Sequence, residues 1–381
     1  MTGPGASARG WARTRSFFPV SREFVYLNHA GVAPISTRAA EALARYAAEA
    51  TGRGAFHYDA FYDAEVERVR GRAATLLGAR REEIAFVKNT TEGLGLVAQG
   101  LAWQPGDRIL SCDLEYPSNV HPWWSLRDRG VETVLLPGRE GRLPIETVEA
   151  ALASPDVRLL ALSSVEFGSG ARNDLAALGA LCRERGVLFC VDAIQSLGVL
   201  PLDVSALGVD FLAADGHKWL CSVEGCGIFY CAASLQERLR PRVIGWRNVA
   251  DNRDFDRYQT ELQTSAIRYE EGTPNTPGLF ALGAALDLIL ELGVDAIAER
   301  VLGLTEALVT GLAARGATVV SPRGAEASGI VAFRWGEEPA PRTVARLRAA
   351  KLCLAARRGC VRASPHFYND EREIEALLAA L

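Results

Sequence analysis

Lys218 stands at the end of an apolar segment, directly behind a glycine and a histidine, in the stretch "ADGHKWL" (214–220). Lysine is rarely buried without a partner, so this side chain either extends outward to solvent or is kept for its amine. Asp192 ends an earlier apolar segment, "CVDAIQSLG". A buried acid and a buried lysine either form a structural ion pair or serve one ligand together, and the ion pair alone is weak evidence of stabilisation.

The second possibility fits the chemistry of pyridoxal phosphate (PLP). PLP needs an amine to form a Schiff base, a carboxylate to keep its pyridine nitrogen protonated, and an anion site for its phosphate. The stretch "KNTTEGLG" offers the hydroxyls of Thr90 and Thr91 and free N–H groups at the start of a predicted helix. Alone, this stretch is typical of a helix N-cap. Combined with Asp192 and Lys218, it predicts a phosphate site.

Strands and helices alternate from about residue 64 onward, which predicts an α/β fold with a mostly parallel sheet flanked by helices. Apolar runs with little alternation, such as "VLFCVDAI" and "VDFLAADG", are expected of strands covered on both faces. Polar clusters follow the predicted strand ends at residues 89–93, 115–119, 164–170, 192–195 and 215–218. Because ligands bind at the carboxyl ends of parallel strands, clusters at several strand ends predict one site.

A change in composition near residue 285 predicts a domain boundary. We expect residues 1–25 to be a poorly ordered leader, 26–285 a large PLP-binding domain, and 286–381 a small C-terminal α+β domain. The N-terminal segment can pack with the small domain.

The formal net charge of −4 gives no electrostatic reason to expect a nucleic-acid partner. No apolar run approaches the roughly 20 residues that span a bilayer, so we expect no membrane partner. The eight cysteines match no common zinc spacing, which predicts no metal site, and their scatter suits a reducing compartment. We therefore expect a soluble cytoplasmic protein.

The chain resembles the class V aminotransferases, which are fold-type I PLP enzymes, and within them the cysteine desulfurase and isopenicillin N epimerase-like branch. The motifs that carry the resemblance are "YLNHAGVAPIS", "NTTEG", "VDAIQSLG", "DFLAADGHKWL", "EEGTPNTPG" and "VRASPHFYND". They span nearly the whole chain. They are specific for the fold and the cofactor, and much less specific for the substrate.

The resemblance implies a role for each matching residue. Lys218 forms the Schiff base and moves protons at the substrate α-carbon, Asp192 pairs with the pyridine nitrogen, and Gln195 bonds the phenolic oxygen. The resemblance also implies that Thr90, Thr91 and His217 contact the phosphate and that Tyr116 stacks on the ring face. It implies a homodimer with shared active sites, in which Thr273 contacts the phosphate of the neighbouring subunit. Arg362 would bind the carboxylate of an amino-acid substrate, and Asn28 and His29 would contact the substrate.

Several of these residues also have an ordinary structural interpretation. Tyr116 is compatible with a half-buried tyrosine at a strand end, Arg362 with a surface arginine, and His29 with a satisfied loop histidine. The roles of Glu166, Arg172 and Asp215 stay open.

The sequence departs from the desulfurases in three places. They carry a histidine at the position of Tyr116, often a serine or threonine at that of Asp215, and a catalytic cysteine on a lid loop upstream of the carboxylate-binding arginine. Here "LCLAARRGCVRAS" runs directly into Arg362, and Cys360 is too close to Arg362 to act as a lid cysteine, so its role is open.

We therefore expect an epimerase-like or C–S/β-lyase-like enzyme that removes the α-proton of an amino acid bound to the cofactor. A true aminotransferase or a cysteine desulfurase is the alternative. A non-catalytic scaffold with the same fold is an alternative of a different class, which the presence of Lys218, Asp192 and Arg362 disfavours.

Overall fold

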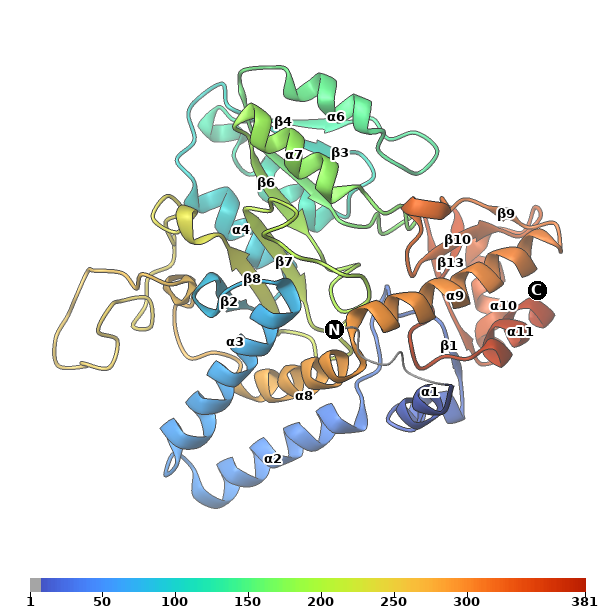
Figure 1. Cartoon of the computed structure of the whole chain (residues 1–381), viewed down its shortest axis with the longest axis horizontal. Coiled ribbons are helices and arrows are strands. Elements are labelled where there is room, and N and C mark those ends of the chain that lie inside the picture. Colours follow the sequence, from blue (N-terminus) through green and yellow to red (C-terminus); the bar gives the residue numbers. More distant parts are fainter. Residues whose placement is uncertain (1–7) are drawn as a thin grey trace.

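The computed structural model describes residues 8–381 and has a seven-stranded sheet at its centre, in the order β2-β8-β7-β6-β5-β3-β4 (Figure 1). The strands are β2 (Ile84–Val87), β3 (Arg108–Cys112), β4 (Glu132–Leu136), β5 (Val157–Ser163), β6 (Leu188–Asp192), β7 (Phe211–Asp215) and β8 (Gly227–Cys231). The predicted α/β fold with a mostly parallel sheet flanked by helices is confirmed.

Strands β7, β6, β5, β3 and β4 are parallel, whereas β8 runs antiparallel to β7 and β2 antiparallel to β8. A parallel pair needs a crossover of a dozen or more residues, usually with a helix. Residues 216–226, which join β7 to β8, form only turns and irregular structure, so β8 returns as a hairpin. Strand β2 then runs in the direction of β7, so the carboxyl ends of six strands lie at one edge.

The strands have apolar side chains on both faces because helices cover both. Leu212 and Ala214 of β7 lie in one core cluster, with apolar residues of α3 (Ala64–Leu77), α6 (Ile145–Leu152), α7 (Leu175–Arg185) and α8 (Thr276–Leu292). Phe211 and Ala213 lie in the other, with residues of α4 (Thr90–Gly100) and α5 (His121–Trp124). Helix α2 (Thr37–Arg53) packs along α8.

The C-terminal part forms a second, smaller sheet in the order β12-β13-β10-β9, all antiparallel. Its elements are α9 (Val294–Ala313), β9 (Thr318–Val319), β10 (Val331–Arg334), α10 (Ala340–Ala349), β12 (Ala355–Arg357), β13 (Cys360–Ala363) and α11 (Glu371–Ala380), and they share a core of their own. The boundary expected at residue 285 falls inside α8, whose Leu286 and Ile289 belong to the large core. We propose to place it after α8, at Gly293.

The expectation of a poorly ordered leader is wrong for residues 8–25. Helix α1 (Ala8–Arg15) and a short turn lead into β1 (Val25–Tyr26), which pairs with β11 (Leu352–Cys353) of the small domain. Phe18 is fully buried and stacks on Tyr368 with ring centroids 4.0 Å apart. These buried aromatic contacts outweigh the polar composition of the segment. Residues 1–7 of the expected leader lie outside the described residues.

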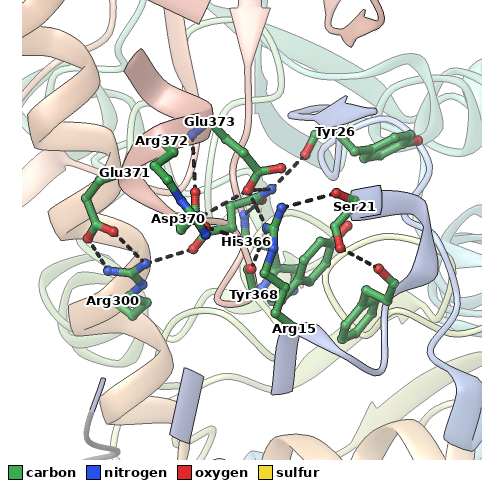
Figure 2. A network of polar contacts seen from close by, with 12 residues as sticks. Arg15, Ser21, Tyr26, Arg300, His366, Tyr368, Asp370, Glu371, Arg372 and Glu373 are labelled. Atoms are coloured by element: carbon green, nitrogen blue, oxygen red, sulfur yellow. Dashed lines mark hydrogen bonds and ion pairs between the residues drawn. The ribbon is translucent and has the colours of Figure 1, made fainter. Parts of the chain in front are cut away.

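A network of polar contacts fastens this segment to the C-terminal motif (Figure 2). Arg15 donates to the Tyr368 carbonyl at 3.0 Å and to the Glu373 carboxylate at 2.6 Å. Glu373 in turn accepts from the backbone of Asp370 at the start of α11. The segment that precedes the site in sequence is therefore tied to the segment that follows it. Within residues 8–381, no helix is both long and apolar enough to cross a membrane.

Candidate active site

A cavity of about 430 Å³ opens where the carboxyl ends of the central strands meet. The predicted site residues that line it are Asn28, Thr90, Thr91, Tyr116, Asp192, Gln195, His217, Lys218 and Arg362. Asn89, Ser118, Phe167, Asp215 and Arg357 line it as well. The five polar clusters of the sequence thus contribute to one site.

The central pair is Lys218, in the turn after β7, and Asp192, at the end of β6. Burial raises the pKa of Asp192 to about 6, while a hydrogen bond from the Ile194 N–H at 2.9 Å and the nearby Lys218 act in the opposite direction. Burial lowers the pKa of Lys218 to about 8; Asp192 raises it and Arg362 lowers it further. At neutral pH the carboxylate is ionised and a fraction of the amine is neutral, which suits an acid–base lysine.

The start of α4 has the features of an anion site. Asn89 caps the helix by accepting from the Glu92 N–H at 2.9 Å, so the N-cap interpretation of this stretch holds for Asn89. Thr90 Oγ1 is buried without a hydrogen-bond partner in the part of the chain that the structure describes. Thr91 Oγ1 donates to Ser118 Oγ at 2.8 Å. A helix N-terminus with an unsatisfied hydroxyl fits a phosphate.

His217 completes this side of the cavity. Its Nδ1 lies 3.0 Å from Asp215 Oδ2 but in a direction that makes no hydrogen bond, so this nitrogen has no partner among the residues described. Asp215 is buried and its Oδ1 accepts from the Gly216 N–H at 2.7 Å. The sequence left the role of Asp215 open, and the structure places its carboxylate beside the His217 ring without a hydrogen bond to it.

Tyr116 lines the cavity and is 45% exposed. Lys218 Nζ lies 5.6 Å from its ring centroid, and the ring makes a T-shaped contact with Phe167. Asp192, Gln195 and the start of α4 line the same cavity, which therefore offers a carboxylate and an anion site together. The residues present fit PLP.

Arg362 on β13 is almost fully buried at the cavity wall. It donates to the Phe167 carbonyl at 2.7 Å, and its Nε is a buried donor without a partner in residues 8–381. Burial, with a contribution from Arg357, lowers its pKa to about 9. A buried guanidinium with donors to spare suits a carboxylate, which it can bind with two hydrogen bonds.

The sequence analysis missed Arg357, which also lines the cavity from the exposed end of β12. Strands β12 and β13 form a hairpin in which Arg357 pairs with Cys360 and Ala355 with Arg362. The signal was the stretch "ARRGCVR", whose central glycine marks a tight turn between two short strands.

Three of the predicted or open residues lie elsewhere. His29 does not line the cavity: its Nδ1 donates to the Ser364 carbonyl at 2.8 Å and its Nε2 accepts from the Tyr368 hydroxyl at 2.7 Å. The expectation that it contacts substrate is corrected, because both ring nitrogens are used in the core. Thr273 lines a separate small cavity beside Glu271. Arg172 lines a larger cleft of about 1120 Å³ between α7 and the loop before α6.

That larger cleft carries arginines and carboxylates in mixture, for example Arg142 paired with Glu326 at 2.9 Å, and it does not include Lys218. We therefore place the active site in the smaller cavity on the basis of its chemistry. Glu166 is fully buried and does not line the smaller cavity; its Oε1 accepts from Asn173 at 3.0 Å. Burial raises the pKa of Glu166 to about 7.

Comparison with known proteins identifies the family. Residues 25–377 match the sequence profile of the aminotransferase class-V family. The chain belongs to this family. It is 30% identical, over 95% of both chains, to a probable cysteine desulfurase of Methanothermobacter thermautotrophicus.

Solved structures of family members agree with the fold. An apo cysteine desulfurase from Thermococcus onnurineus superimposes with a TM-score of 0.90 at 27% identity, covering 100% of this chain and 98% of that one. The cystine C–S lyase C-DES, in complex with its product cysteine persulfide, gives 0.89 at 28%, covering 95% and 98%. Another C-DES structure carries glycine covalently linked to PLP. The present chain is a PLP-dependent class V enzyme.

Proposed function

We propose that this protein is a PLP-dependent C–S lyase that acts on cystine or on a related cysteine derivative with a second carboxylate. The observation that carries the proposal is the lack of an accessible thiol at the cavity. All eight cysteines lie within residues 8–381; seven are buried, and Cys353 is half-buried beside Tyr26. None lines the cavity around Lys218. Without a thiol to take up sulfur, the sulfur leaves with the product.

Cysteine desulfurase is the second candidate, because two of the three relatives described above carry that name. The names of all three involve sulfur chemistry on cysteine or cystine, which favours C–S cleavage over the epimerase-like or aminotransferase outcomes that the sequence also left open. The tight β12–β13 hairpin, which stands where the desulfurases carry a lid cysteine, favours the lyase.

When bound, PLP supplies an electron sink for negative charge at the substrate α-carbon. Lys218 is the proposed base: it can lie within reach of that carbon, and its lowered pKa leaves neutral amine available to take the proton. Asp192 would hold the pyridine nitrogen in its charged form, and Thr90, Thr91 and His217 would hold the phosphate. Arg362 would grip the α-carboxylate and so fix which bond at the α-carbon faces Lys218.

Arg357 supports the choice of substrate. It places a second guanidinium at the exposed side of the same cavity, beyond Arg362. Cystine carries a second carboxylate on its distal half, and an exposed arginine at the mouth is suited to receive it.

The test is the fate of L-cystine and, in a separate assay, of L-cysteine with the purified holoenzyme. A lyase converts cystine and water into pyruvate, ammonia and cysteine persulfide, whereas a desulfurase converts cysteine into alanine and leaves the sulfur on an enzyme thiol. We expect pyruvate from cystine, and we expect a Cys353→Ser/Cys360→Ser double variant to keep this activity while Lys218→Ala loses it. Alanine as the product, with loss of activity in the double variant, would establish the desulfurase instead.

We also propose that the protein is a homodimer with shared active sites. Thr273 lies outside the cavity of its own chain, as a residue that serves the neighbouring subunit must. Residues 243–258 expose apolar side chains, among them Phe255 and Tyr258. The eight free cysteines suit a reducing compartment, so we propose the cytoplasm as its location.

A further inference from the structure

Trp219, the residue after Lys218, contacts the active site through Gln195. Its indole Nε1–H donates to Gln195 Oε1 at 2.9 Å, and the Gln195 Nε2 donates to the Ala30 carbonyl at 3.2 Å. Both side chains are almost fully buried, and Gln195 lines the cavity whereas Trp219 does not.

These two bonds fix the direction of the Gln195 amide. An indole N–H can only donate and a backbone carbonyl can only accept, so one of the two amide orientations satisfies both partners and the other satisfies neither. In the satisfied orientation Oε1 bonds Trp219, which does not line the cavity, and Nε2 bonds the carbonyl of Ala30, which does. The second N–H of Nε2 has no partner among the residues described, and it is the donor that the amide can offer to a ligand in the cavity.

Trp219 is itself held from the small domain. The Phe367 N–H donates to His366 Nδ1 at 2.8 Å, so the proton of the neutral ring is on Nε2, which donates to the Trp219 carbonyl at 2.9 Å. Burial lowers the pKa of His366 to about 4, which keeps this ring neutral. A Cβ placed on Gly329 would lie 2.5 Å from the indole ring, so Gly329 leaves the space in which the ring sits.

We propose that Trp219 is a positioning residue: its indole N–H locks the Gln195 amide so that a donor, and never an acceptor, faces the phenolic oxygen of the cofactor. This inference rests on the proposed orientation of PLP. Trp219 touches neither cofactor nor substrate. Its contribution is to exclude the flipped amide, which would place Oε1 against an anionic oxygen.

The test is a pH titration of the visible absorption band of the holoenzyme, in which PLP is joined to Lys218. A hydrogen-bond donor to the phenolic oxygen stabilises the form with the greater negative charge on that oxygen. Loss of this donor therefore raises the pKa that the titration of the band measures. We expect Trp219→Phe to raise this pKa by about 1 to 2 units, the size of one hydrogen bond to a charged group. Gln195→Met should give a similar shift, and the double variant no further one.

Trp103→Phe is the matched control, because Trp103 also donates its indole N–H, to the Ala98 carbonyl, but does not line the cavity. Its band should titrate as in the wild type. The inference is overturned if Trp219→Phe leaves the pKa of the band unchanged, or if its shift adds in full to that of Gln195→Met. A wild type without any visible band would contradict the proposed cofactor site instead.

A second measurement does not require the Trp219→Phe variant to fold. In apoenzyme labelled with ¹⁵N-tryptophan, we expect one of the seven indole N–H signals to shift and exchange faster in Gln195→Met, while the others stay. If none of the seven changes, the bond between Trp219 and Gln195 does not exist in solution and the inference fails.

Discussion

Lys218 is a reactive amine because of its surroundings, and two neighbours act on it with opposite sign. Asp192 raises the pKa of Lys218 and Arg362 lowers it, in addition to a larger lowering by burial.

The rate at which the apoenzyme captures PLP tests these effects. Since only the neutral amine attacks the PLP aldehyde, we expect this rate to rise with pH, with a midpoint at about pH 8. Asp192→Asn should move the midpoint down and Arg362→Met should move it up. Stopped-flow absorbance measures this rate, and equal midpoints in all three proteins would contradict the assignment.

Glu166 offers a test of how burial acts on a single carboxyl. Its pKa is raised from 4.5 to about 7, so between these values the folded protein binds a proton that the unfolded chain has released. The stability that this provides is complete below about pH 4.5 and is lost as the pH rises through about 7. Glu166→Gln has no such dependence and can still accept from Asn173.

The free energy of unfolding of Glu166→Gln, relative to wild type, should therefore increase by about 2 to 3 kcal/mol from about pH 4.5 to about pH 7. Urea unfolding of the two apoenzymes near both ends of this range measures the difference. The same difference at both pH values would show that Glu166 titrates normally in the folded protein.

Helix α4 can be tested with two of its own glycines. A Cβ on Gly93 would lie 2.7 Å from the Ala213 Cβ of β7, whereas a Cβ on Gly95 would meet nothing within 4 Å. Gly95→Ala should stabilise the protein by about 0.5–1 kcal/mol through helix propensity. Gly93→Ala should destabilise it by about 1–3 kcal/mol through overpacking and weaken PLP binding, because it displaces the start of the helix. Thermal unfolding and PLP titration measure both; equal effects would mean that α4 does not pack on β7 as described.

The elements that the sequence predicted well are those with a local signal. The helix over α3, the strands β5 to β7 and the motif at the start of α4 follow from periodicity and capping residues. To predict the antiparallel direction of β8, one has to know that the residues between Lys218 and β8 form no crossover helix. Arg357 was missed because its place in the cavity depends on a hairpin whose strands pair outside the central sheet.

At the scale of the whole molecule, the predictions failed where segments that are distant in sequence pack against each other. The arginine-rich N-terminal segment was expected to be poorly ordered, yet Phe18 finds its partner Tyr368 at the other end of the chain. His29 was likewise assigned to the substrate because its segment borders the site, although its two partners come from residues 364–368. Contacts between parts so far apart in sequence leave no pattern in either part alone.

The segment of residues 243–258 carries the last prediction, on assembly. Phe255 is 71% exposed and Tyr258 fully exposed, and a monomer gains nothing from presenting them to water. We expect Phe255→Asp/Tyr258→Asp to convert a dimer into a monomer in light scattering, and to weaken PLP binding because the neighbour's Thr273 is withdrawn. Phe24→Ser, which removes an exposed aromatic ring beside Lys351 of the small domain, should leave the dimer intact. A wild type that is itself monomeric and holds PLP firmly would show that each chain completes its site alone.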